Sequence, residues 1–122
     1  MIKLCILVVL YSFCTVTIAI EPPVLQKPLM IPSELRLGER ADVICTLRRG
    51  DLPVTFRWFF NNRPIEDEKL GKVASYDVRS SVYLMESLKA ENVGNYTCEV
   101  TNKAGQDMAS GQLLVEGELK LL

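Results

Sequence analysis

The sequence contains no histidine among its 122 residues, and aromatic residues make up only 7% of it. Histidine is the commonest general base near neutral pH, so its absence excludes Ser-His and Cys-His nucleophile pairs and most catalytic zinc sites. We therefore expect a protein that is not an enzyme, with no catalytic residues, no metal, no cofactor and no small-molecule substrate.

Charge of one sign is also scarce in this chain. It carries 14 basic and 15 acidic residues, a net charge of −1, and its longest run of like charge is Glu66-Asp67-Glu68. This balance provides no field that would hold a phosphate backbone, so we expect no nucleic-acid partner. The three carboxylates are better explained as a solvated surface than as an acid–base pair.

The first twenty residues differ from the rest of the chain. Lys3 is followed by an uncharged stretch of seventeen residues, and Thr17 and Ala19 place small side chains three and one residues before a cut after Ala19. This pattern predicts a secretory signal peptide over residues 1–19 and a secreted, extracellular product. The alternative is an uncleaved signal anchor, because seventeen uncharged residues approach the length that spans a membrane.

The cysteines divide at the predicted cut. Cys5 and Cys14 leave with the signal peptide, whereas Cys45 and Cys98 remain in an oxidising compartment. Two cysteines permit one intramolecular disulfide. On the chain-entropy model, closing so long a loop stabilises the fold by about 4 kcal/mol.

Beyond the leader, apolar residues recur at every second position. Ala41, Val43, Cys45 and Leu47 illustrate the period of two that is typical of half-buried strands. The same alternation recurs, and turn-forming residues separate the segments that carry it, which are residues 54–58, 83–85, 96–100 and 111–115. Short strands at this spacing in about 100 residues predict a β-sandwich or a β-barrel.

The expected organisation is a single domain, as the length suggests. It comprises a signal peptide at 1–19, a proline-rich lead-in at 20–27, the folded domain at 28–116 and a C-terminal tail at 117–122. Glu21-Pro22-Pro23 is too rich in proline to begin a central strand. Asn61-Asn62 suits a tight hairpin because asparagine tolerates a positive φ.

Four residues narrow the choice among β folds. Trp58 follows Cys45 by thirteen residues, and Tyr96 precedes Cys98 by two. This spacing is that of an all-β, immunoglobulin-like two-sheet Greek-key sandwich. In such a fold the disulfide joins the two sheets, the indole packs against it, and the tyrosine hydroxyl binds the backbone at a corner.

Longer stretches resemble the intermediate (I-set) immunoglobulin domains of cell-surface adhesion receptors. They are Pro28-Leu29, Glu39-Arg40-Ala41, residues 92–98 and Asn102-Lys103-Ala104-Gly105. Residues 50–58 resemble more narrowly the Down syndrome cell adhesion molecule (Dscam) family, especially its arthropod members. The resemblance implies neuronal or immune surface recognition, including axon guidance, by long and often homophilic receptors with many such domains and a membrane anchor.

The chain departs from that family in three respects, one of which is that residues 117–122 have no equivalent in the family pattern. It ends at Leu122 without a hydrophobic segment for an anchor, so the alternatives are a soluble secreted modulator or immune recognition factor and a fragment of a longer membrane receptor. Asn92 stands where the family usually has aspartate, so an ion pair there becomes a neutral hydrogen bond. The leading expectation is weak binding to another immunoglobulin domain, which includes its own copy, with membrane contact only through an uncleaved signal or a receptor anchor.

Strand parity marks candidate interface residues. If Cys45 points inward, Ile44 points outward, and if Tyr83 points inward, Val82 and Leu84 point outward on the strand that pairs with it. These three residues form either a docking patch or scattered surface apolar positions. On the other sheet, Phe59 is expected to face outward as an anchor, unless the neighbouring hairpin covers it.

Two further motifs concern the surface. Asn95-Tyr96-Thr97 is a glycosylation sequon that places Asn95 on an outward face. Arg49-Gly50-Asp51 spells the integrin tripeptide on a predicted loop, but its glycine and aspartate also belong to the family-like turn. We expect the turn, and not integrin binding, to explain this tripeptide.

Overall fold

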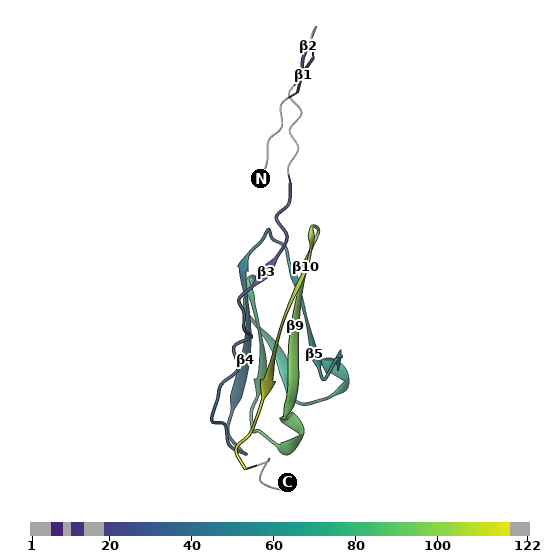
Figure 1. The fold of residues 1–122 in the computed structure, drawn as a ribbon. Helices are drawn as coiled ribbons and strands as arrows, with labels where there is room; N and C mark the ends of the chain where they lie inside the picture. The colour runs from purple at the N-terminus through teal and green to yellow at the C-terminus, as the bar shows by residue number, and fades with distance from the viewer. Residues whose placement is uncertain (1–5, 9–10, 14–18, 118–122) are drawn as a thin grey trace.

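The structure, a computed structural model, describes residues 6–8, 11–13 and 19–117. Two antiparallel four-stranded sheets face each other across a common core (Figure 1), which confirms the predicted immunoglobulin-like sandwich. Within the predicted signal peptide, β1 (Ile6–Val8) and β2 (Tyr11–Phe13) pair as a separate hairpin. The rest of that segment up to residue 18 and residues 118–122 of the predicted tail lie outside the described residues.

The chain crosses between the sheets three times, as a Greek-key sandwich requires. The first sheet has the order β3-β4-β8-β7 and consists of β3 (Val24–Leu25), β4 (Ala41–Arg49), β8 (Ser80–Met85) and β7 (Lys72–Asp77). The second has the order β10-β9-β5-β6 and consists of β10 (Gly105–Leu113), β9 (Gly94–Asn102), β5 (Thr55–Phe60) and β6 (Arg63–Pro64). Two of the crossings contain short 3-10 turns, η1 (Ile65–Asp67) and η2 (Ala90–Asn92).

The alternation seen in the sequence builds the core. On β4, Ala41, Val43, Cys45 and Leu47 are all buried, whereas Asp42 and the other intervening residues are half-buried. Successive side chains of a strand point to opposite faces, so one face of β4 lies against the second sheet and the other is left outside. The core is therefore filled from the inner faces of both sheets, and the outer faces remain for contacts with other molecules.

The hairpin between β5 and β6 forms as predicted. Asn61 and Asn62 have φ angles of 49° and 67°, the left-handed region that asparagine tolerates. The Oδ1 atom of Asn61 also accepts a hydrogen bond of 2.9 Å from the Asn95 N–H, which joins the hairpin to β9. Gly94 is needed beside it, because a Cβ there would lie 2.6 Å from the Phe60 ring.

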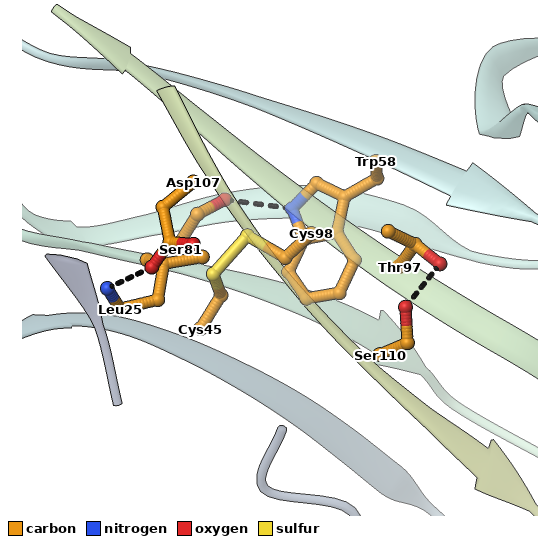
Figure 2. The surroundings of a disulfide bond; sticks show 8 residues. All are labelled: Leu25, Cys45, Trp58, Ser81, Thr97, Cys98, Asp107 and Ser110. Carbon is orange, nitrogen blue, oxygen red and sulfur yellow. Dashed lines mark hydrogen bonds between the residues drawn. A yellow bond between two sulfur atoms is a disulfide. The ribbon is translucent and has the colours of Figure 1, made fainter. Parts of the chain in front are cut away.

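The first sheet begins within the segment that we expected to be a lead-in. Val24 pairs with Arg49 and Leu25 pairs with Leu47, and Leu25 is only 2% exposed. Prolines before an edge strand are tolerated because no neighbour requires their missing N–H. The Leu25 N–H donates a hydrogen bond of 2.8 Å to Asp107 Oδ2 on β10, so this short strand ties the two sheets together (Figure 2).

Candidate functional site

The centre of the sandwich contains the residues expected there. A disulfide joins Cys45 of the first sheet to Cys98 of the second, and Trp58 is the register partner of Cys98 (Figure 2). The indole is 2% exposed, and its Nε1–H donates a hydrogen bond of 2.9 Å to Ser81 Oγ. Ser81 was not identified from the sequence, because its role depends on its register partner, Cys45.

The Tyr96 hydroxyl also binds the backbone at a corner between the two sheets, as predicted. The Tyr96 hydroxyl donates a hydrogen bond of 2.6 Å to the Asn92 carbonyl, and burial raises the pKa of Tyr96 far above its ordinary value. The hydroxyl therefore remains a donor at any physiological pH. The Asn92 side chain accepts from the Lys89 N–H and donates to the Leu70 carbonyl, so neutral hydrogen bonds are present there, as the sequence predicted.

The outer face of the β4–β8 pair carries three of the predicted interface residues. Ile44 and Leu84 are half-buried, but Val82 is only 6% exposed. The expectation that Val82 is exposed was wrong, although it lies outside the central core cluster. Because β8 is an inner strand, Val82 has Ile44 as a register partner on one side and Ala74 on the other, and these neighbours cover it.

Met30 enlarges this surface, although it lies in a proline-flanked segment for which alternation predicts nothing. It is 53% exposed, and it pairs with Ile44 in an isolated antiparallel bridge. Directly paired residues point to the same face, so Met30 adjoins Ile44 on the outer face. Beside them is a hollow of about 620 Å³, which is lined by Gln26, Pro28, Leu29, Met30, Ile31, Pro32, Asp42 and Ile44. We call Met30, Ile44, Val82 and Leu84 the apolar strip.

Charged residues of both signs border the apolar strip. Arg40 forms ion pairs with Asp42, at 3.2 Å, and with Glu86, at 3.5 Å. Asp42 and Lys72 are the two register partners of Leu84, one on each neighbouring strand. The strip therefore has an apolar centre and a mixed, solvated rim, which is the usual anatomy of a protein interface.

The outer face of the second sheet is more polar. Phe59 is half-buried, and the Arg57 guanidinium carbon lies 5.0 Å from the centre of its ring. The Arg57 guanidinium group therefore lies over the Phe59 ring in a cation–π contact and covers part of it. Asn95 is half-buried on β9, and its side-chain amide donates a hydrogen bond of 3.5 Å to the Thr97 hydroxyl. The Thr97 hydroxyl is also hydrogen-bonded to the Ser110 hydroxyl (Figure 2).

The Arg49-Gly50-Asp51 tripeptide is part of a clamp on residue 21. The Glu21 N–H donates a hydrogen bond of 2.9 Å to Asp51 Oδ2, and the Asp51 N–H returns one of 3.0 Å to the Glu21 carbonyl. Gly50 has a φ of 125° and passes so close to Pro23 that a Cβ would lie 2.6 Å from its Cα. The Asp51 carboxylate, which an integrin would need, is hydrogen-bonded within the fold, a contact that the sequence did not predict.

Neither a metal centre nor a spanning helix marks the described part of the chain. Residues 6–8, 11–13 and 19–117 contain no group of three or more potential metal-binding His, Cys, Asp or Glu side chains. Within the same ranges, no helix has the length and apolar character needed to cross a bilayer.

Comparisons with known proteins agree with the fold. The family model of the immunoglobulin domain matches residues 22–102. Cell adhesion molecule Dscam1 of Drosophila melanogaster is 31% identical over 103 residues, and cell adhesion molecule DSCAM of Homo sapiens is 30% identical over 101 residues. These alignments cover 80% and 83% of this chain but only 5% of either relative, so the chain corresponds to a small part of each.

Solved structures lead to the same family. The crystal structure of the Dscam1 Ig7 domain, isoform 5, superimposes with a TM-score of 0.70 at 29% identity, covering 78% of this chain and 97% of that one. An I-band fragment of titin, I67–I69, has a TM-score of 0.69 at 28% identity and covers 80% of this chain and 33% of that one. These likenesses confirm the predicted resemblance to Dscam immunoglobulin domains. Because the family model matches most of the residues and the fold agrees along nearly all of a Dscam1 domain, the chain belongs to the immunoglobulin domain family.

Proposed function

We propose that this chain is an extracellular recognition domain that binds another immunoglobulin domain, including a second copy of itself, through the apolar strip. Its relatives named above are cell adhesion molecules, and an immunoglobulin domain family with such members indicates binding rather than enzymatic activity. The observation that carries the proposal is the exposed Met30 beside Ile44 and an apolar hollow on one outer face.

The rim of the strip suits pairing with an identical copy. A two-fold axis brings the same patch of two copies together. The apolar centres of the two copies then meet, and the rim of one copy faces the opposite end of the same rim on the other copy. Because Arg40 and Lys72 lie on the same rim as Asp42 and Glu86, the cations of one copy can meet the anions of the other. A single sandwich face buries a small area, so the affinity is weak, and multivalent display strengthens it.

Sedimentation equilibrium over a wide range of concentrations tests this proposal. We expect reversible dimers, and Met30→Asp or Leu84→Asp should weaken the association by about tenfold or more, as loss of an interface anchor does. Met108→Asp is the matched control, because Met108 is 46% exposed on the opposite sheet. A strict monomer at the highest concentration would exclude self-recognition, and dimers that tolerate both substitutions would remove the strip from consideration.

We also propose that the chain is secreted after cleavage behind Ala19 and carries a glycan on Asn95. The support is the leader pattern together with the place of Asn95 on β9, in the sheet opposite the apolar strip. A glycan there leaves the strip uncovered. Mass spectrometry of the exported protein tests both modifications: we expect an N-terminus at Ile20 and a mass that falls after amidase treatment, and the unmodified mass would refute them.

A further inference from the structure

Residue 21 lies at the N-terminal edge of the sandwich, and several contacts hold it there. The Glu21 carbonyl accepts hydrogen bonds from the Asp51 N–H, at 3.0 Å, and from the Asn102 side-chain amide, at 2.8 Å. The Asn102 amide also donates to the Asp51 carbonyl at 3.0 Å, which joins the β4–β5 loop, the end of β9 and residue 21 at one point. The ends of most domains are poorly ordered unless such contacts tie them down. The position of Glu21 is therefore set by the tertiary structure.

The backbone after residue 21 is equally constrained. Pro22 and Pro23 each have a φ angle fixed by the proline ring. Gly50 packs so closely against them that a Cβ there would lie 2.6 Å from Pro23 Cα and 2.9 Å from the Pro22 carbonyl oxygen. Ile20, which is 41% exposed, is the residue between this anchored segment and the proposed cut after Ala19. Cleavage therefore leaves a new chain end one residue away from a fixed part of the fold.

Cleavage also changes the charge at Ile20. Hydrolysis of the Ala19–Ile20 peptide bond consumes one water and leaves a carboxylate on Ala19 and an amino group on Ile20. This amino group is mostly protonated at neutral pH, because its ordinary pKa is about 8. Its nitrogen is three covalent bonds from the Glu21 nitrogen, so the two lie at most about 3.7 Å apart. The Glu21 N–H is bonded to Asp51 Oδ2 at 2.9 Å, so the new cation forms within about 7 Å of that carboxylate oxygen.

The Asp51 carboxylate has no cation of its own among the described residues. In residues 19–117, no lysine or arginine nitrogen lies within 4.0 Å of its oxygens. The other carboxylate of this edge, Glu21, is already ion-paired with Arg49 at 3.9 Å. Arg48 at the end of β4 and Lys103 on the β9–β10 turn are the further cations of the segments that pack against residue 21. Asp51 is therefore the carboxylate available to a cation that forms at residue 20.

We propose that the Asp51 carboxylate binds the α-ammonium group of Ile20 after leader cleavage, and that this ion pair stabilises the cleaved chain but not its uncleaved precursor. In the precursor, the Ile20 nitrogen is a neutral amide and offers no charge. In the cleaved chain, one carboxylate accepts the Glu21 N–H and pairs with the adjacent ammonium, and hydrogen bonds to ionised groups are stronger than neutral ones. The ion pair requires the proposed cleavage behind Ala19, so it rests on that part of the proposed function, but it is independent of the apolar strip.

Selective acetylation of the exported protein tests this ion pair. The full chain is expressed in eukaryotic cells, the product is purified from the medium, and mass spectrometry identifies its first residue. Limiting acetic anhydride at about pH 6.5 then acetylates the α-amine, because lysines are more fully protonated at that pH. Acetylation restores a neutral amide at Ile20, as in the precursor. In urea unfolding at the same pH, the free-amine form should have a folded-to-unfolded ratio about two- to fivefold higher, the range of an exposed ion pair.

The dependence on pH supplies a second readout. The ion pair raises the pKa of the amino group in the folded state, so its stabilising effect is complete below the unfolded-state pKa and is lost as the pH rises through the folded-state value. The two forms should therefore be equally stable at about pH 10. A first residue other than Ile20 would refute both the proposed cleavage and the ion pair. A first residue of Ile20, with equal stability of the two forms at about pH 6.5, would overturn the ion pair alone.

Substitutions assign the effect to Asp51. Asp51→Asn keeps an oxygen that can accept the Glu21 N–H and removes the charge, so acetylation should no longer change the stability of this variant. The pKa of the Ile20 amino group, followed by NMR, should also be lower in Asp51→Asn than in the unaltered protein. Glu21→Gln is the matched control, because it removes the neighbouring carboxylate and leaves Asp51 in place. An acetylation effect that persists in Asp51→Asn, or that disappears equally in Glu21→Gln, would overturn the proposal.

Discussion

The contribution of the Trp58–Ser81 hydrogen bond to the stability of the core can be measured by substitution. It spans 2.9 Å between a tryptophan that is 2% exposed and a serine that is 4% exposed, so water cannot replace a lost partner. Ser81→Ala removes the acceptor and leaves the indole N–H buried, which should lower the free energy of unfolding by about 1–3 kcal/mol. In a domain of this size, each kcal/mol corresponds to a decrease of about 4–8 °C in Tm.

A double-mutant cycle separates the hydrogen bond from other effects of the substitution. Trp58→Phe deletes the donor, so Ser81→Ala in that background leaves no N–H unpaired and should cost less than about 0.5 kcal/mol further. Urea unfolding should be followed by far-UV circular dichroism, because the chain has a single tryptophan and two of the three variants in the cycle lack it. An equal cost of Ser81→Ala in both backgrounds would refute the assignment of this stability to the hydrogen bond.

Two more predictions concern contacts that join distant parts of the chain. Burial alone would raise the pKa of Asp107, but hydrogen bonds from Lys27 and the Leu25 N–H hold it below the ordinary 3.8. The ionised Asp107 carboxylate therefore stabilises the fold fully above pH 3.8, and this stabilisation is lost as the pH falls through the lower, folded-state pKa. Asp107→Asn should lower the free energy of unfolding at pH 7 and have less effect in strong acid. An equal effect of the substitution at both pH values would contradict this prediction. Asp51→Ala should release Glu21 and speed proteolysis near residue 20, whereas unchanged resistance to protease would show that the clamp is dispensable.

The alternation of apolar residues along the sequence correctly predicted which side chains of a strand point into the core and which point outward. It identified the inward face of β4 and the outward direction of Ile44, because a strand alternates whatever its neighbours are. It failed for the exposure of Val82, since exposure depends on which strands flank β8. It was silent on Met30, whose place beside Ile44 results from an isolated bridge between segments that no local pattern connects.

The sequence by itself determined the fold class of this protein, because the cysteines, tryptophan and tyrosine that build the core occur at fixed intervals along strands of period two. Only the tertiary structure decided how the Asp51 carboxylate is engaged and which residues complete the apolar strip. The reason is physical. Strand direction follows from neighbouring residues, whereas burial, hydrogen-bond partners and local charge depend on register and on segments that meet only after folding.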